Sequence, residues 1–90
     1  MKKDKEIKAV LGRQLKKYRV KSLKKSPAQL AKIMKEDFPD DKIQRGTITN
    51  QEKSPSYSYI MWLYEKSHRT LNIEWLFAGE DDDSIPMIKI

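Results

Sequence analysis

Prolines divide the first two thirds of this chain into short segments, and each proline stands close to where a helix begins or ends. In Ser26-Pro27-Ala28-Gln29 the serine can cap a helix, the proline fits the first helical position, and the glutamine completes a capping box. Phe38-Pro39 ends this helix at or before Phe38, because the residue before a proline avoids the helical region. Ser54-Pro55-Ser56 makes a turn that carries the cap of another helix. The sequence therefore predicts an all-α fold built from short helices.

Five segments have apolar residues at helical spacing: residues 5–21, 26–38, 42–52, 57–67 and 73–77. In the first, the spacing from Ile7 to Leu11, Leu15 and Tyr18 is four, four and three residues, which makes one apolar stripe. Similar stripes complete the expected core with Leu30, Ile33, Met34, Ile48, Tyr57, Ile60, Leu63, Tyr64, Ile73, Leu76 and Phe77. Off the stripe of the fourth segment lie Tyr59 and Trp62, which we interpret as partial core or, preferably, as a dimer contact.

The composition argues against several classes of protein. With 90 residues the chain makes one small domain, and without cysteine it has neither a disulfide nor a cysteine-based zinc site. Its one histidine, His68, leaves no histidine cluster for a metal, so we expect no metal and no other cofactor. A Gly-rich phosphate loop and a nucleophile beside a base are both missing, which argues against an enzyme. The apolar runs are too short for a membrane span and no signal peptide is visible, so we expect a soluble, cytoplasmic protein.

The net charge of +6 is unevenly distributed along the chain. Residues 1–35 carry thirteen Lys and Arg against two acids, Asp4 and Glu6. Residues 36–41 contain four acids, and the end of the chain includes the run Asp81-Asp82-Asp83, which we interpret as solvated. A basic half beside a neutral to acidic half suits a surface that binds a polyanion on one side only.

Residues 43–52 have the pattern of a helix that reads DNA. Asp40 or Asp41 can cap this helix, so we expect it to begin at about residue 42. Arg45 and Thr49 lie four residues apart, as do Gly46 and Asn50, and such pairs share one side of a helix. Arg can bind guanine with two hydrogen bonds and Asn can bind adenine in the same way. The segment is therefore predicted to be a recognition helix for the major groove.

The order of these motifs resembles the phage repressor/Cro-type (XRE-like) helix-turn-helix family of transcriptional regulators. Leu30-Ala31 lies in the second helix, Arg45-Gly46-Thr47-Ile48-Thr49-Asn50 in the third, and Pro55-Ser56 opens the fourth. Asn72-Ile73-Glu74-Trp75-Leu76-Phe77-Ala78-Gly79-Glu80 is similar to the N-x-x-W-L-L-x-G-E ending of phage-type regulators. The resemblance covers about residues 11–80. It implies a compact five-helix, lambda-repressor-like domain over residues 1–80, followed by an acidic and apolar tail over 81–90.

The resemblance also implies roles for individual residues. Arg45, Gly46 and Asn50 fall where the family contacts bases, with Thr49 beside them. Contacts to phosphate are expected from Gln44, Lys16, Lys17, Lys42 and Lys53. Arg19 and Glu52 match a pair that often forms a buried ion pair between the first and third helices. The implied partner is double-stranded DNA, bound by a homodimer of a bacterial or phage-encoded repressor.

Departures from the family pattern leave a second hypothesis open. The turn between the second and third helices is expanded and contains four acids: Glu36, Asp37, Asp40 and Asp41. Pro27 stands where many relatives have a phosphate-binding Gln, and the short link from Glu52 to Pro55 lacks the usual Asn-Gly. The alternative is therefore a protein-interaction module, such as an antitoxin-like partner of another protein, with weak or no DNA binding.

Overall fold

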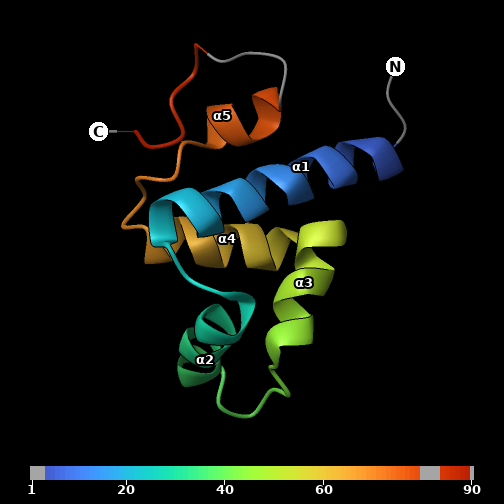
Figure 1. Ribbon diagram of the computed structural model, residues 1–90, viewed down its shortest axis with the longest axis vertical. Helices are drawn as coiled ribbons and strands as arrows, with labels where there is room; N and C mark the ends of the chain where they lie inside the picture. The colour runs from blue at the N-terminus through green and yellow to red at the C-terminus, as the bar shows by residue number, and fades with distance from the viewer. Residues whose placement is uncertain (1–3, 80–83, 90) are drawn as a thin grey trace.

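The computed structural model describes residues 4–79 and 84–89, and five α-helices and one π-helical turn lie in this part of the chain. They are α1 (Asp4–Tyr18), η1 (Arg19–Leu23), α2 (Pro27–Asp37), α3 (Arg45–Lys53), α4 (Tyr57–Lys66) and α5 (Ile73–Ala78). In Figure 1, α1 and α4 cross the middle of the molecule, α5 lies above α1, and α2 and α3 extend downward. The one β-bridge between described residues joins Leu71 to Ile88. The predicted all-α fold is confirmed for this part of the chain.

Side-chain caps set the starts of most helices where the sequence predicts them. Ser26 Oγ accepts a hydrogen bond from Gln29 N at 3.1 Å, and Gln29 Oε1 accepts from Ser26 N at 2.8 Å, which is the predicted capping box. The helix α4 is capped by Ser56 and α5 by Asn72. The prediction for α3 is wrong at its start: the helix begins at Arg45 because Gln44, and not an aspartate, is the N-cap residue.

The first helix ends differently from the prediction of a single α-helix over residues 5–21. It continues beyond Tyr18 as the π-helical turn η1, in which Lys24 N donates to Arg19 O and Lys24 adopts a left-handed φ of 55°. Such a turn closes i→i+5 hydrogen bonds, so it is wider than an α-helical turn. The adjacent side chains of Tyr18 and Arg19 are both buried. A charged residue therefore lies in the interior at the start of this turn.

The core lies between α1, α4 and the helices above and below them. Its buried apolar residues are Leu11, Leu15, Tyr18, Leu30, Ala31, Ile48, Tyr59, Ile60, Trp62, Leu63, Leu71, Trp75 and Leu76. The predictions for Tyr57 and Phe77 are wrong, since these side chains are 78% and 60% exposed. Tyr57 is the first residue of α4, and Phe77 lies on the outer side of the short helix α5, whose inner side carries Trp75 and Leu76.

Tyr59 and Trp62, which we interpreted as a dimer contact, are instead buried within this chain. Their exposed fractions are 1% and 8%, and their rings stack with centroids 6.1 Å apart. Burial raises the pKa of Tyr59, and the carboxylate of Glu52 raises it further. The helix α4 turns these two aromatic rings inward together with Ile60 and Leu63. The two rings are therefore unavailable to a second copy.

Residues 84–89 return to the core instead of forming a separate tail. Asn72 N donates to Met87 O at 2.9 Å, Lys89 N donates to Thr70 O at 2.7 Å, and Asn72 Nδ2 donates to Pro86 O at 2.8 Å. Ile85, Met87 and Ile88 are partly buried against the core. The acidic run Asp81-Asp82-Asp83 lies outside the described residues. Residues 84–89 therefore belong to the same packed unit as residues 4–79.

Two contacts hold α3 against the first helix. At Gly12, where α1 crosses the end of α3, an added Cβ would lie 1.9 Å from the carbonyl oxygen of Glu52. Farther along, Arg19 Nε and Glu52 Oε2 form an ion pair at 2.6 Å, and Arg19 Nη2 donates to Glu52 Oε1 at 3.2 Å. Arg19 Nη1 also donates to Lys25 O at 2.8 Å. This is the ion pair that the family resemblance implied, and it fixes α3 to the end of α1.

We predict that Gly12→Ala destabilises the fold by more than about 3 kcal/mol, because the new methyl group meets rigid backbone and the helices must separate. Gly46→Ala is the matched control: no atom lies within 4 Å of its Cβ position. That substitution should raise stability by about 0.5–1 kcal/mol, since alanine favours the helix. Urea unfolding followed by circular dichroism measures both. Equal stability of the two variants would contradict the close crossing.

Glu52→Ala is predicted to cost about 3–5 kcal/mol, because it leaves the guanidinium of Arg19 buried without its carboxylate. The double variant Arg19→Met/Glu52→Leu removes both charges, and it should recover most of that loss. Thermal and urea unfolding of the two variants provide the comparison. A double variant as unstable as Glu52→Ala would show that packing around these residues matters more than their charges.

Candidate nucleic-acid interface

One face of α3 is buried and the opposite face is open. Ile48 is fully buried, because α3 packs against both α1 and α2. Gly46, Asn50 and Lys53 are exposed and Thr49 is half-buried. Their spacing of three or four residues places these four positions along one side of the helix. Three of the four residues predicted to contact bases, Gly46, Thr49 and Asn50, thus share the exposed face of α3 with Lys53.

The polar side chains of α3 divide into those that the fold uses and those that it leaves available. Thr47 Oγ1 accepts from Gln44 N at 3.1 Å at the start of the helix. Thr49 Oγ1 donates to Gly46 O at 3.1 Å, and Gln51 Oε1 accepts from Ser56 N at 2.7 Å across the turn to α4. Arg45, Asn50 and Lys53 make no side-chain hydrogen bond or ion pair with another described residue. These three side chains are available to a ligand.

Two of the residues predicted to contact phosphate, Gln44 and Lys42, lie in the connection between α2 and α3. Gln44 is its exposed N-cap residue, and Lys42 is exposed in the connection instead of lying within the helix as predicted. Lys35 Nζ donates to the backbone oxygen of Asp41, which ties the connection back to α2. Both Gln44 and Lys42 therefore lie at the end of α3 where Arg45 also lies.

Of the four acids in and before this connection, one has a structural partner. Asp37 Oδ2 accepts from Trp62 Nε1 at 2.7 Å and forms an ion pair with Lys66 Nζ at 2.8 Å, joining the end of α2 to α4. Hydrogen bonds from Lys66 and Trp62 lower the pKa of Asp37. The side chains of the other three acids are exposed and make no ion pair with a described residue: Glu36, Asp40 and Asp41.

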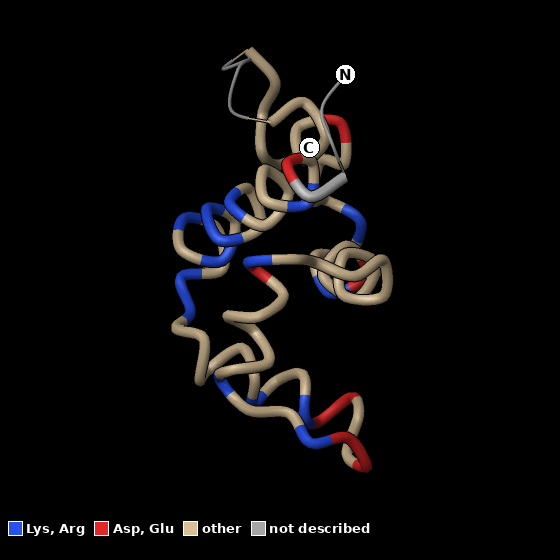
Figure 2. The backbone as a smooth tube through the Cα atoms, turned by 90° about the vertical axis from the view of Figure 1, so that its right-hand side faces the viewer, with Lys and Arg blue, Asp and Glu red and all other residues tan. Residues whose placement is uncertain are grey.

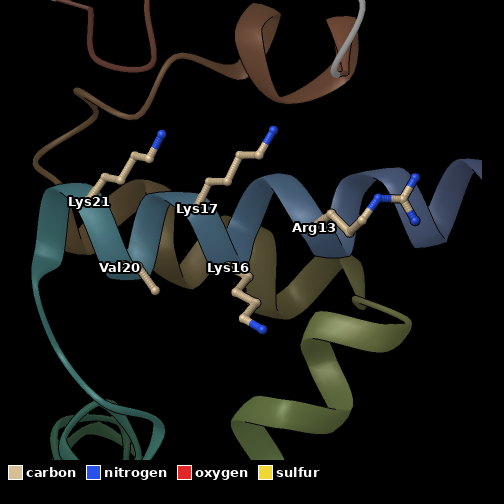
Figure 3. A pocket seen from close by; sticks show the side chains of 5 residues that line it. All are labelled: Arg13, Lys16, Lys17, Val20 and Lys21. Carbon is tan, nitrogen blue, oxygen red and sulfur yellow. The ribbon is translucent and has the colours of Figure 1, made fainter.

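The outer face of α1 and η1 is strongly basic. A shallow hollow on this face is lined by Arg13, Lys16, Lys17, Val20 and Lys21. In Figure 3, Lys16 points to the side of α1 where α2 and α3 lie, whereas Lys17 and Lys21 point to the side of α5. Of the two predicted phosphate contacts on α1, Lys16 is therefore the one directed toward α3.

The cations of α1 and the acids of the α2–α3 connection lie apart in space. Figure 2 shows Lys and Arg along α1 on one side of the tube, and Asp and Glu of the α2–α3 connection at the lower end, toward the opposite side. Between them runs α3. A polyanion that approaches from the side of α1 would meet the cations before the acids.

No other kind of functional site is found in the described residues, and comparison with known proteins adds none. Within residues 4–79 and 84–89, no group of three or more His, Asp or Glu could hold a metal ion. No helix in this part of the chain is long and apolar enough to cross a membrane. Comparison with protein-family models, with curated proteins and with solved structures finds no match. The candidate site in the described residues is therefore α3 with its surroundings.

The contact of Asp37 with Trp62 and Lys66 is the main polar feature that sequence reasoning missed. The signal was present, because Trp62 and Lys66 are four residues apart and so share one side of α4. The partner on α2 is not recognisable from the sequence, because Asp37 is one of four acids within residues 36–41 and spacing does not show which of them faces α4.

We predict that the stabilising contribution of Asp37 to the fold is lost in acid. Because the folded-state pKa of Asp37 is lowered from its usual 3.8, its contribution is complete above that value and is lost as pH falls through the lowered pKa. The melting temperature of Asp37→Asn should therefore lie below that of the wild type at neutral pH, and the gap should close below about pH 4. Asp40→Asn is the control, with no such gap. A gap of constant size down to pH 2 would contradict this role.

Proposed function

We propose that the protein binds double-stranded DNA in a sequence-specific manner and acts as a transcriptional repressor, with α3 in the major groove. The observation that carries the proposal is the exposed face of α3, where Asn50 is free to bind a base. Asn can make two hydrogen bonds to adenine, which few other side chains do. Thr49 and Gly46 lie beside it on the same face, and the small Gly46 permits close approach of the backbone. In this proposal the domain is lambda-repressor-like, with α2 and α3 as the helix-turn-helix.

Contacts to the DNA backbone complete the proposed interface. Lys53 lies at the far end of the same face of α3, and Lys42 and Gln44 lie at its start. Lys16 points from α1 toward α3 and supplies a further cation. Lys17 points away from α3, so its contribution is to the long-range attraction of DNA. The proposed repressor is a cytoplasmic homodimer that binds two half-sites, and its interface lies elsewhere than at Tyr59 and Trp62.

A second candidate function is favoured by the acids of the α2–α3 connection. Glu36, Asp40 and Asp41 are exposed near the start of α3, where they oppose the approach of phosphate. In this hypothesis the same fold binds a protein that has a basic surface, as an antitoxin-like partner does. Titration of a labelled random-sequence duplex at low and moderate salt separates the two functions. Binding that weakens steeply with salt supports the first, and no binding at either salt overturns it.

Asn50→Ala is predicted to weaken binding to the preferred duplex by about 1–3 kcal/mol, with little effect on random DNA, because a base contact is lost. Selection from a random pool provides the preferred sequence, and fluorescence anisotropy measures both affinities. Lys53→Ala is the control on the same face, and it should weaken both duplexes equally. Equal loss on the two duplexes for Asn50→Ala would exclude base reading by this residue.

A further inference from the structure

The expanded connection leaves a hollow between α2 and the start of α3. Its lining comes from one side of α2 and from the residues that lead into α3: Ala28, Ala31, Lys32, Lys35, Glu36, Ile43, Gln44 and Arg45. Alanine contributes only a methyl group, so two of the α2 positions leave the space open. Residues 38–44 connect the two helices that form this hollow, which we call the groove.

Two of the cations that line this groove come from different helices. Lys32 belongs to α2 and Arg45 is the first residue of α3, and both are exposed. Neither makes an ion pair with a described residue. The third cation in the groove, Lys35, donates to the backbone oxygen of Asp41 and so is held by the fold. Two unpaired cations on different helices are suited to one anion between them.

The acid at the other end of the groove limits where an anion can lie. Ala28, Lys32 and Glu36 follow one another at intervals of four residues, so they are stacked along one side of α2. The carboxylate of Glu36 lies one turn beyond Lys32, toward the acidic connection. An anion is therefore attracted at the end of the groove that Lys32 occupies and repelled at the end that Glu36 occupies.

We infer that this groove holds the phosphodiester backbone of the bound DNA, with Lys32 and Arg45 contacting phosphate from different helices. The inference rests on the proposed function and changes the role that the family resemblance implied for Arg45. Arg45 lines the groove beside α2, and it thereby becomes a backbone contact instead of a base contact. Base reading is left to Asn50 and its neighbours on the exposed face of α3. Lys32 becomes a DNA-binding residue that the sequence did not indicate.

The test compares substitutions in the groove on two labelled duplexes, the preferred sequence and a random one, over a series of salt concentrations. Lys32→Ala and Arg45→Ala should each weaken both duplexes by the same factor and reduce the salt slope by about 0.9. If the affinities of variant and wild type are equal at 1 M salt, that slope change corresponds to roughly an eightfold loss of affinity at 0.1 M salt. Arg45→Lys should bind nearly as the wild type does, because phosphate accepts a point charge whereas two-bond base reading does not. Glu36→Gln should bind both duplexes more tightly.

Lys89→Ala is the matched control, since it removes the same charge from an exposed residue outside the groove lining, held beside Thr70 by the hydrogen bond from Lys89 N to Thr70 O. Its affinities should stay within about twofold of the wild type. Circular dichroism confirms that each exposed substitution leaves the fold intact. If Lys32→Ala binds as tightly as Lys89→Ala, the proposal that the groove binds phosphate is overturned. If Arg45→Ala loses sequence preference, Arg45 contacts a base and not the backbone. Wild-type protein that binds neither duplex would overturn the proposed function itself.

Discussion

The close crossing of α1 over the end of α3 is the contact on which the rest of the arrangement depends. At Gly12 there is no room for a side chain, because the backbone oxygen of Glu52 occupies the space. The same Glu52 directs its carboxylate to Arg19, which is buried at the start of the π-helical turn that follows α1. One residue of α3 thus meets α1 through both its backbone and its side chain. The exposed face of α3 is oriented by these two contacts.

Acidic residues in this chain have two different physical roles. Glu52 and Asp37 are paired with cations and join helices that are far apart in sequence. Glu36, Asp40 and Asp41 remain exposed beside the start of α3, where they lower the attraction of this end for phosphate. The net charge of the chain hides this difference. The surface proposed to bind DNA therefore has a basic side near α1 and an acidic boundary at the α2–α3 connection.

The sequence predicted the helices better than it predicted which side of each helix is buried. Local signals suffice for the capping box at Ser26 and the stop at Phe38, because the interacting groups are a few residues apart. Side-chain direction depends on neighbours from other parts of the chain. Tyr57 and Phe77 satisfied a helical spacing but lie at the start and on the outer side of their helices. Tyr59 and Trp62 lie off the apolar stripe of their helix, and the groups that cover them, such as Asp37 against Trp62, come from other parts of the chain.

The sequence by itself determined the all-α class, the order of the helices, and the residue types on α3 that can hydrogen-bond to a base. Periodicity and capping decide these features, and both act over a few residues. Only the tertiary structure decided that Arg45 lines a groove with Lys32, that Lys16 and Lys17 point to different sides of α1, and that residues 84–89 return to the core. Each of these depends on how helices cross and on the path of a connection. Those are set by packing between distant residues, which a single sequence does not display.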